Sequence, residues 1–267
     1  MSKTVRIDRR GPVFTITLDR PDRLNAISPD LIADLSEALD ECAGDTDMRV
    51  LILTGAGRGF CAGADLAPEG SGKRPSLRQR KLAHKRGMDE GFNGLVRRLK
   101  DMPAPTIAAV NGVAAGGGCG LALSCDVVIA ADVARFILVF VPQLGLIPDM
   151  GATWFFPRAM GRARSLGRAF FGEPISAEEA VEMGLIWKQV PEADFPQVVE
   201  DAAQVLARGP TRAYVATRHA MDMATINTLP RQLDLEAEIQ PELLVSEDVR
   251  EGVKAFLEKR NPDFTGQ

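Results

Sequence analysis

The sequence predicts an α/β fold with a mainly parallel sheet. Short apolar segments typical of buried strands alternate with segments whose apolar residues recur at helical spacing. The chain has 267 residues, of which 45% are hydrophobic and 25% charged, and its net charge is −4. These values exclude a disordered or fibrous protein. No apolar run approaches the roughly 20 residues that a membrane span requires, so we expect no membrane partner.

The expected elements follow one another through the first half of the chain. Residues 12–19 alternate apolar and polar side chains, which indicates a strand. Residues 28–45 carry apolar side chains at helical spacing, and Ser28 before Pro29 is typical of a helix start. Three continuous apolar runs predict strands that are buried on both faces: 49–55, 104–112 and 127–131.

The second half is predicted to be helical from residue 151 onward, apart from a short strand at 185–190. Five segments have the pattern of amphipathic helices: 161–172, 176–184, 195–209, 211–222 and 246–260. We therefore expect a core over residues 1–200, which holds the functional site, and a helical region over residues 201–267.

Cysteine and histidine usage argues against disulfides and metal sites. The four cysteines form no Cys-x-x-Cys pair, and the two histidines, His84 and His219, have no partners at ligand spacing. The first residues enter a strand-like alternation without the apolar region of a signal peptide. We expect reduced thiols, no metal and a cytoplasmic location.

Residues 73–86 carry seven Lys or Arg and no acidic residue. Three interpretations stay open for this basic segment: a solvated helix face or mobile loop, a site for an anionic ligand, and nucleic-acid binding. The acidic balance of the whole chain makes nucleic-acid binding the least favoured of the three.

Two glycine-rich loops suggest that backbone amides are used to bind a ligand. The first reads CAGADLAPEG at 61–70, and the second reads NGVAAGGGCGLALSCD at 111–126. Glycine lets a ligand approach the backbone closely, and a helix start adds a positive field. Neither loop has the G-x-G-x-x-G spacing of a dinucleotide fold, and no G-x-S-x-G or P-loop motif is present. Tight packing alone is the competing explanation.

Several long motifs resemble the enoyl-CoA hydratase/isomerase (crotonase) superfamily, in the same order and through nearly the whole chain. They lie at 21–28, 58–66, 105–131, 145–165 and 251–264. The resemblance implies a crotonase-like spiral of ββα units with a C-terminal helical trimerisation region, and hence a homotrimer or hexamer. It also implies an acyl-CoA thioester as substrate, no separate cofactor, and an oxyanion hole made by the backbone N–H groups of Ala64 and Gly117.

The acidic residues of the matching motifs point to the isomerase branch of this superfamily. The hydratases that the chain resembles use two glutamates. The first position is Gly120 here, and the second is Phe140 or Gln143, depending on the register. Asp149 is the acid that remains in the right segment, and the resemblance implies that it acts as the single base of a 1,3-proton shift. The alternative is a helix N-cap at Asp149, a role that would lower its pKa.

The resemblance also implies contacts to coenzyme A. One group lies at a strand end and in the first glycine loop: Arg23, Leu24, Ala26, Asp65 and Leu66. A second group, Phe256 and Lys259, would reach the ligand of a neighbouring subunit. Surface exposure or helix packing explains each of these residues equally well.

The function expected from the sequence is therefore an enoyl-CoA isomerase. The alternatives are an enoyl-CoA hydratase with an atypical site, and a non-catalytic homologue that binds acyl-CoA or RNA. Trp154, Phe155 and Phe156 follow the predicted base and would allow an aromatic acyl group, although core packing accounts for them too.

Overall fold

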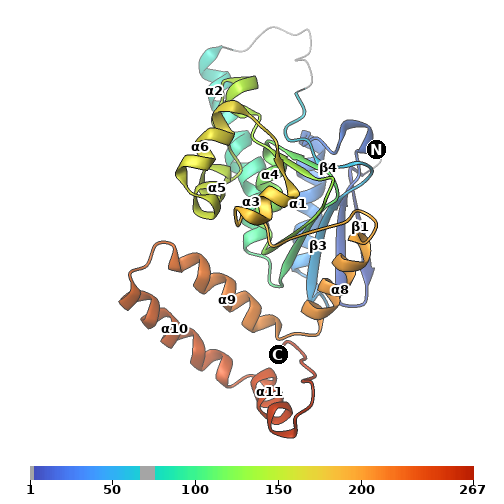
Figure 1. Ribbon diagram of the computed structural model, residues 1–267, viewed down its shortest axis with the longest axis vertical. Coiled ribbons are helices and arrows are strands. Elements are labelled where there is room, and N and C mark those ends of the chain that lie inside the picture. Colours follow the sequence, from blue (N-terminus) through green and yellow to red (C-terminus); the bar gives the residue numbers. More distant parts are fainter. Residues whose placement is uncertain (1–2, 67–75) are drawn as a thin grey trace.

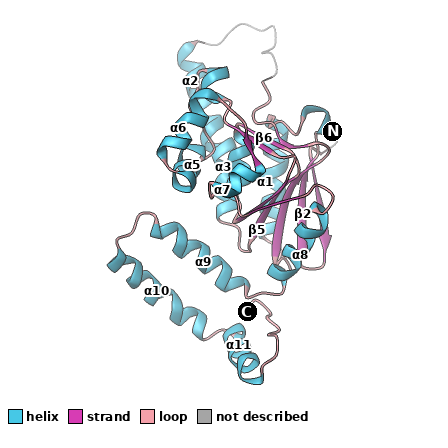
Figure 2. Ribbon diagram, in the orientation of Figure 1, coloured by secondary structure: helices cyan, strands magenta, loops and turns pink. Residues whose placement is uncertain are grey.

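The computed structural model describes residues 3–66 and 76–267 and confirms the α/β class. One sheet has the strand order β1-β2-β3-β5-β7-β10, and within it only β1 and β2 pair antiparallel (Figure 2). Its strands are β1 (Val5–Arg10), β2 (Val13–Leu18), β3 (Val50–Gly55), β5 (Thr106–Val110), β7 (Val127–Ala131) and β10 (Lys188–Val190). The four longer predicted strands and the short one at 185–190 all fall in this sheet.

A second, smaller sheet consists of very short strands, which were not predicted individually. Its order is β4-β6-β8-β9, and its strands are β4 (Gly59–Cys61), β6 (Val113–Ala115), β8 (Arg135–Ile137) and β9 (Ile175–Ser176). Each long strand β3, β5 and β7 is followed by one strand of this small sheet and then by helices. This repeat is the ββα spiral that the resemblance implies.

Helices cover the sheets and form the second half of the chain. Those of the first half are α1 (Pro29–Ala43), α2 (Leu77–Arg86), α3 (Asn93–Lys100) and α4 (Gly117–Ser124). Those of the second half are α5 (Ala152–Met160), α6 (Arg162–Phe171), α7 (Ala177–Glu182), α8 (Phe195–Ala207), α9 (Thr211–Ala224), α10 (Leu229–Leu244) and α11 (Glu247–Glu258). Within the described residues, α10 is a helix that was not singled out from the sequence.

Both faces of the large sheet are buried at its central strands β3, β5 and β7, as the continuous apolar runs predict. Alternate residues of β3 enter different clusters: Leu51 and Leu53 pack with α1, α3 and α4, whereas Val50 and Ile52 pack against α8. Because successive side chains of a strand point to opposite faces, a strand between two helical layers needs apolar residues at every position.

The C-terminal helices extend away from this core (Figure 1). Arg218 of α9 ties them back, since its guanidinium donates to Asp126 Oδ2 at 3.0 Å. Arg49 at the start of β3 holds the connection before α9 through the Thr211 hydroxyl and the Gly209 carbonyl, at 2.5 and 2.6 Å. A boundary at residue 200 stays a prediction, and α8 runs through that position.

Candidate active site

The two glycine loops lie in direct backbone contact. Gly63 has a φ of 86°, and a methyl group added to it would lie 2.8 Å from the Ala115 carbonyl oxygen and 3.3 Å from the Gly117 nitrogen. A methyl group added to Gly118 would collide with the Cys61 carbonyl oxygen. The bare backbone of both loops is therefore required for their close approach. This contact brings the two predicted oxyanion donors to adjacent segments.

The first donor, the Ala64 N–H, points away from the pairing that holds its loop. Ala64 forms a parallel bridge with Ile27, in which the Ile27 N–H donates to the Gly63 carbonyl at 2.7 Å and the Asp65 N–H donates to the Ile27 carbonyl at 2.9 Å. In a parallel ladder the residue between these two bonds directs its own N–H to the other side. Ala64 is exposed, and its N–H meets no acceptor among the described residues.

The second donor, the Gly117 N–H, lies at the start of α4. It is the first residue of that helix, so its N–H has no intrahelical acceptor and carries the positive end of the helix dipole. Gly116, which precedes it, has φ 52° and ψ −122°, a conformation suited to glycine. The arrangement can stabilise negative charge on an oxygen placed between the two amides.

Asp149 is held beside the same helix by its neighbour Met150. A methyl group added to Gly120 would lie 2.5 Å from Met150 Cβ and would collide with the Met150 carbonyl oxygen. One added to Gly117 would lie 2.7 Å from Met150 Sδ. The turn that carries Asp149 thus packs on the first turn of α4. Position 120, where a hydratase-type glutamate would begin, has no room for a side chain.

The other positions considered for a second glutamate are also occupied in ways that exclude one. Phe140 is 5% exposed, and a methyl group added to Gly116 would lie 3.6 Å from its ring. Gln143 is exposed, in the π-helical turn η3 (Phe140–Leu144). In either register an apolar or amide side chain stands where a second carboxylate was sought.

The carboxylate of Asp149 has the electrostatic character of a base for neutral pH. Partial burial raises its pKa from 3.8 to about 6, against a smaller lowering effect of His84 and of its own backbone N–H. Helix α5 has Gly151 as its N-cap, with no side-chain capping bond. The capping alternative, with its lowered pKa, is therefore wrong, and the carboxylate is left available.

His84 of α2 is a neighbour of Asp149 that carries no sequence signal for this position. The two residues are 65 positions apart, and no motif links them. Of the basic segment 73–86, residues 73–75 lie outside the described part of the chain. The rest forms α2, which Ser76 caps through its side chain and backbone. Of this helix, His84 acts on the predicted base.

Four of the predicted coenzyme A residues gather around the first loop, and a fifth lies close in sequence. The Ala62 N–H donates to the Leu24 carbonyl at 2.9 Å, next to the bridge that pairs Ala64 with Ile27. Arg20 joins the two segments, because it donates to Asp65 Oδ2 at 2.8 Å and to the Ala26 carbonyl at 2.5 Å. Leu66 is 68% exposed at the end of this loop, and Arg23 is also exposed.

Phe256 and Lys259 are not brought to this site by a single chain. Phe256 is 83% exposed on α11, and Lys259 ends that helix with a φ of 52°. Along the longest axis of the molecule, α11 lies at the end opposite α2 (Figure 1). A contact between these residues and a ligand would need a second copy of the chain.

Asn25 fixes the loop between β2 and α1 that contains Leu24 and Ala26, two of the predicted coenzyme A residues. It is fully buried and left-handed, with φ 57°. Its Nδ2 donates to the carbonyls of Ala56, Gly59 and Phe60 at 3.0, 2.8 and 3.2 Å, and its Oδ1 accepts from the Arg20 N–H at 2.9 Å. An asparagine suits this place because it tolerates positive φ and both accepts and donates.

We expect Asn25→Ala to lower the free energy of unfolding by about 2–4 kcal/mol, since several buried backbone groups lose their partner. Denaturant unfolding followed by circular dichroism measures this. The matched control is Asn261→Ala at an exposed position, which should change the value by less than about 0.5 kcal/mol. Equal effects of the two substitutions would contradict the role of Asn25.

The aromatic residues after Asp149 divide between core and surface. Phe156 is 1% exposed and belongs to the core, which supports the packing interpretation for it. Trp154 is 37% exposed and stacks edge-on against Phe155 at a centroid distance of 5.1 Å, with Arg158 over its ring. Trp154 and Phe155 therefore lie at the boundary between the core and the surface.

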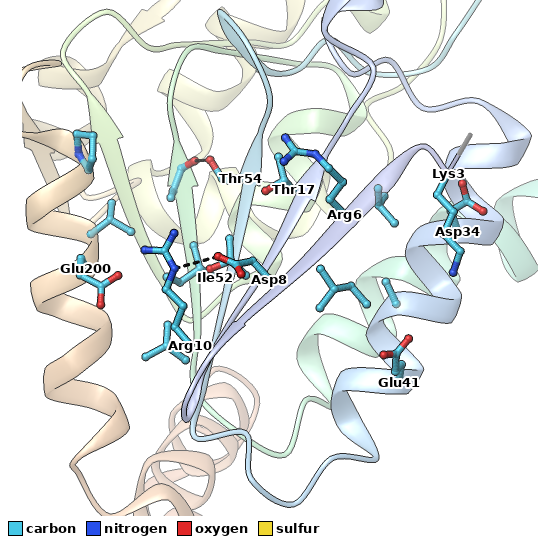
Figure 3. Close-up of a pocket in the computed structure, with 18 of the residues that line it drawn as sticks. Lys3, Arg6, Asp8, Arg10, Thr17, Asp34, Glu41, Ile52, Thr54 and Glu200 are labelled. Atoms are coloured by element: carbon cyan, nitrogen blue, oxygen red, sulfur yellow. Dashed lines mark hydrogen bonds and ion pairs between the residues drawn. The ribbon is translucent and has the colours of Figure 1, made fainter. Parts of the chain in front are cut away.

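A groove of about 930 Å³ lies elsewhere, along β1 and β2 at the edge of the large sheet, and residues of α1 and α8 contribute to its lining (Figure 3). It contains none of the predicted site residues. Two of its cations are paired with carboxylates: Arg10 with Asp8 at 3.0 Å, and Arg6 with Asp19 at 2.7 Å. Cations paired in this way are less available to an anionic ligand.

Residues 3–66 and 76–267 contain no group of three or more side chains arranged to hold a metal ion, and none of their helices has the length and hydropathy to cross a bilayer. The four cysteines are free and buried, and burial raises the pKa of Cys61 and Cys119 to about 12. Thiols with such high pKa values are poor nucleophiles at neutral pH.

Comparisons with known proteins find relatives that match nearly the whole chain. The family model described as enoyl-CoA hydratase/isomerase matches residues 8–267. A 1,2-epoxyphenylacetyl-CoA isomerase of Escherichia coli K12 is 46% identical over 96% of this chain and 95% of its own. A probable enoyl-CoA hydratase of Rhodobacter capsulatus is 45% identical over 99% and 98%. The crystal structure of an enoyl-CoA hydratase from Bacillus anthracis superposes with a TM-score of 0.89 at 32% identity, over 99% and 100% of the two chains.

Proposed function

Because this chain belongs to the enoyl-CoA hydratase/isomerase family, whose members act on CoA thioesters, we propose that it is an enoyl-CoA isomerase. In this proposal it moves a double bond of an enoyl-CoA by a 1,3-proton transfer. The observation that carries the proposal is the pairing of one available carboxylate, Asp149, with a position 120 that has no room for a second.

The proposed mechanism uses one base and two backbone amides. Asp149 removes a proton from C2 of a 3-enoyl-CoA, and the electron pair moves onto the thioester oxygen. The N–H groups of Ala64 and Gly117 stabilise that oxyanion, a contribution worth roughly 100- to 1,000-fold in rate. Protonated Asp149 then returns its proton to C4 as the dienolate collapses to the 2-enoyl-CoA. No atom is gained or lost, so the reaction needs no separate cofactor.

The pKa of Asp149 predicts the pH dependence of this reaction. The base must be ionised, so kcat/KM should rise as the pH increases through about 6 and then level off. His84 lowers that pKa through its positive charge, so His84→Gln should move this rise to higher pH. The pH profile of kcat/KM measures both effects.

His219→Gln is the matched control for this experiment, because His219 is the other histidine of the chain and lies on α9. Its profile should coincide with that of the unmodified protein. A rise that stays in place in His84→Gln would mean that His84 does not act on the base.

A second candidate is isomerisation of an aryl epoxide thioester. It is favoured by the relative named 1,2-epoxyphenylacetyl-CoA isomerase, at 46% identity. Parallel assays with 3-enoyl-CoA thioesters of short, long and aryl acyl groups, with epoxyphenylacetyl-CoA and with crotonyl-CoA test the proposal. Isomerisation of a 3-enoyl-CoA supports the proposal of an enoyl-CoA isomerase, and isomerisation of epoxyphenylacetyl-CoA alone supports the second candidate. Hydration of crotonyl-CoA without isomerisation, or binding of acyl-CoA or RNA with no turnover, overturns the proposal.

We also propose that the chain assembles as a homotrimer or a dimer of trimers. Helix α10 has no buried residue in the single chain, and apolar side chains of α10 and α11 such as Leu233, Val253 and Phe256 are more than half exposed. Burial of these faces between copies would remove that apolar surface from water. Lys259 and Phe256 would then come near a neighbour's ligand. Sedimentation velocity measures the assembly state.

A further inference from the structure

Met150 occupies the joint between the base and the second oxyanion donor. It follows Asp149 directly, is 1% exposed and has a φ of 48°. A left-handed conformation is uncommon for a methionine, and it persists only where the surroundings enforce it. The following Gly151 is also left-handed, with a φ of 82°, so the chain reverses sharply here before α5.

The two parts of Met150 contact two different residues of α4. Its side chain lies over Gly117, where an added methyl group would be 2.7 Å from Sδ and 3.8 Å from Cγ. Its main chain lies over Gly120, where an added methyl group would be 2.5 Å from Cβ and would meet the carbonyl oxygen. Met150 therefore spans the first turn of the helix whose first N–H is the oxyanion donor.

Asp149 depends on this turn for its position. Its carbonyl accepts from the Ala152 N–H at 2.9 Å, which closes the turn into α5. Within the described chain, the carboxylate of Asp149 interacts with its own backbone N–H and makes no hydrogen bond to any other residue. The side chain is thus located by the backbone that carries it, and that backbone rests on α4 through Met150.

We propose that Met150 is a positioning residue, which sets the separation between Asp149 and the Gly117 amide through its packing on α4. This inference rests on the proposed function. The separation matters because the base must reach C2 while the thioester oxygen stays between the two amides, and a displacement of about 1 Å can cost on the order of 100-fold in rate. A long side chain without a branch at Cβ meets this need, since it fills the space over Gly117 without crowding the left-handed backbone.

A double-mutant cycle of Gly117→Ala and Met150→Ala tests the proposal. Gly117→Ala keeps the donor N–H but pushes against Sδ, and we expect it to lower kcat about 10-fold or more. Met150→Ala should lower kcat by a similar factor with KM changed less than about threefold. In the Met150→Ala background, adding Gly117→Ala should cost less than about threefold more. The colliding Sδ atom is gone, and the next atom, Ile27 Cδ1 at 3.2 Å from the added methyl group, is the end of a flexible side chain.

Met150→Leu retains the volume of the side chain and should therefore keep most of the kcat of the unmodified protein. If Met150 contributed to stability alone, the kcat of the folded variants would not depend on this volume. Any of three results would overturn the proposal. The losses in kcat could multiply in the double variant, Met150→Ala could have the kcat of the unmodified protein, or the substitutions could change KM alone. If Met150→Ala does not fold, Met150→Cys replaces it in the cycle, because the Cys side chain is larger than that of Ala, ends at the γ position and lacks the δ atom that Gly117→Ala would meet.

The cycle also separates this inference from the proposed function. If the unmodified protein hydrates 2-enoyl-CoA and does not isomerise 3-enoyl-CoA, the function proposal fails, and the cycle is measured on the hydration reaction. Coupling between the two positions would then still support the role of Met150, whereas independent losses would refute it.

Discussion

Replacement of Asp149 by Asn is expected to lower kcat of isomerisation by about 100- to 10,000-fold, the usual range for loss of a general base. The amide has nearly the same shape as the carboxylate but cannot accept the proton from C2. Because no helix cap is lost, KM should change by less than about threefold. Steady-state kinetics with a 3-enoyl-CoA measures both constants.

The stability of Asp149→Asn is a second readout of the same residue. The pKa of Asp149 is raised in the folded protein from 3.8 to about 6, so the folded state holds the proton more tightly than the unfolded state. The unmodified protein therefore loses stability as the pH rises from about 4 to 6, whereas the variant lacks this loss. At pH 8 its Tm should equal or exceed that of the unmodified protein.

Asp47→Asn, at an exposed position in the turn before β3, is the matched control and should leave kcat and Tm unchanged. Full isomerase activity in Asp149→Asn would remove this residue from the mechanism. A variant with lower activity and a much lower Tm would instead indicate a structural role.

Substitution of Gly120 is expected to abolish activity rather than to create a hydratase. A side chain at this position collides with the backbone of Met150 and displaces the turn that carries Asp149. We expect both Gly120→Ala and Gly120→Glu to lower the free energy of unfolding by about 1–3 kcal/mol or more, and to lower isomerase kcat by about 100-fold. Denaturant unfolding and the two activity assays measure these effects.

Gly167→Ala supplies the matched control, since Gly167 is also helical and an added methyl group there meets nothing within 4 Å. This variant should be as active as the unmodified protein and equally or slightly more stable, because alanine favours a helix. A stable Gly120→Glu protein that hydrates 2-enoyl-CoA would contradict this prediction. It would show that a carboxylate at position 120 can coexist with Asp149 in this fold.

The large sheet could be predicted from the sequence because its strands are long enough to show a pattern. The runs at 49–55, 104–112 and 127–131 are mainly apolar without a polar alternation, and each contains a strand of that sheet. The small sheet could not be predicted in the same way, since its strands have two or three residues. A period cannot be recognised over such lengths. Helix α10 was not predicted from the sequence, because it buries no face in the single chain and contains Pro241.

The site was predictable where a short stretch of sequence determines it. The contact between the loops of Ala64 and Gly117 follows from glycines that allow close approach. The state of Asp149 did not follow, because an acidic residue before a helix has the same sequence signal as a cap or as a base. His84, Asn25 and Met150 owe their roles to contacts between distant segments, which no local pattern encodes.

The central claim is that one carboxylate and two amides isomerise the thioester without adding water. The most direct test is mass spectrometry of the products formed from a 3-enoyl-CoA and, separately, from a 2-enoyl-CoA. The proposal predicts a product of unchanged mass with its double bond moved to C2, and no hydrated product from either substrate. A product heavier by one water, formed at a rate that exceeds isomerisation, would contradict it.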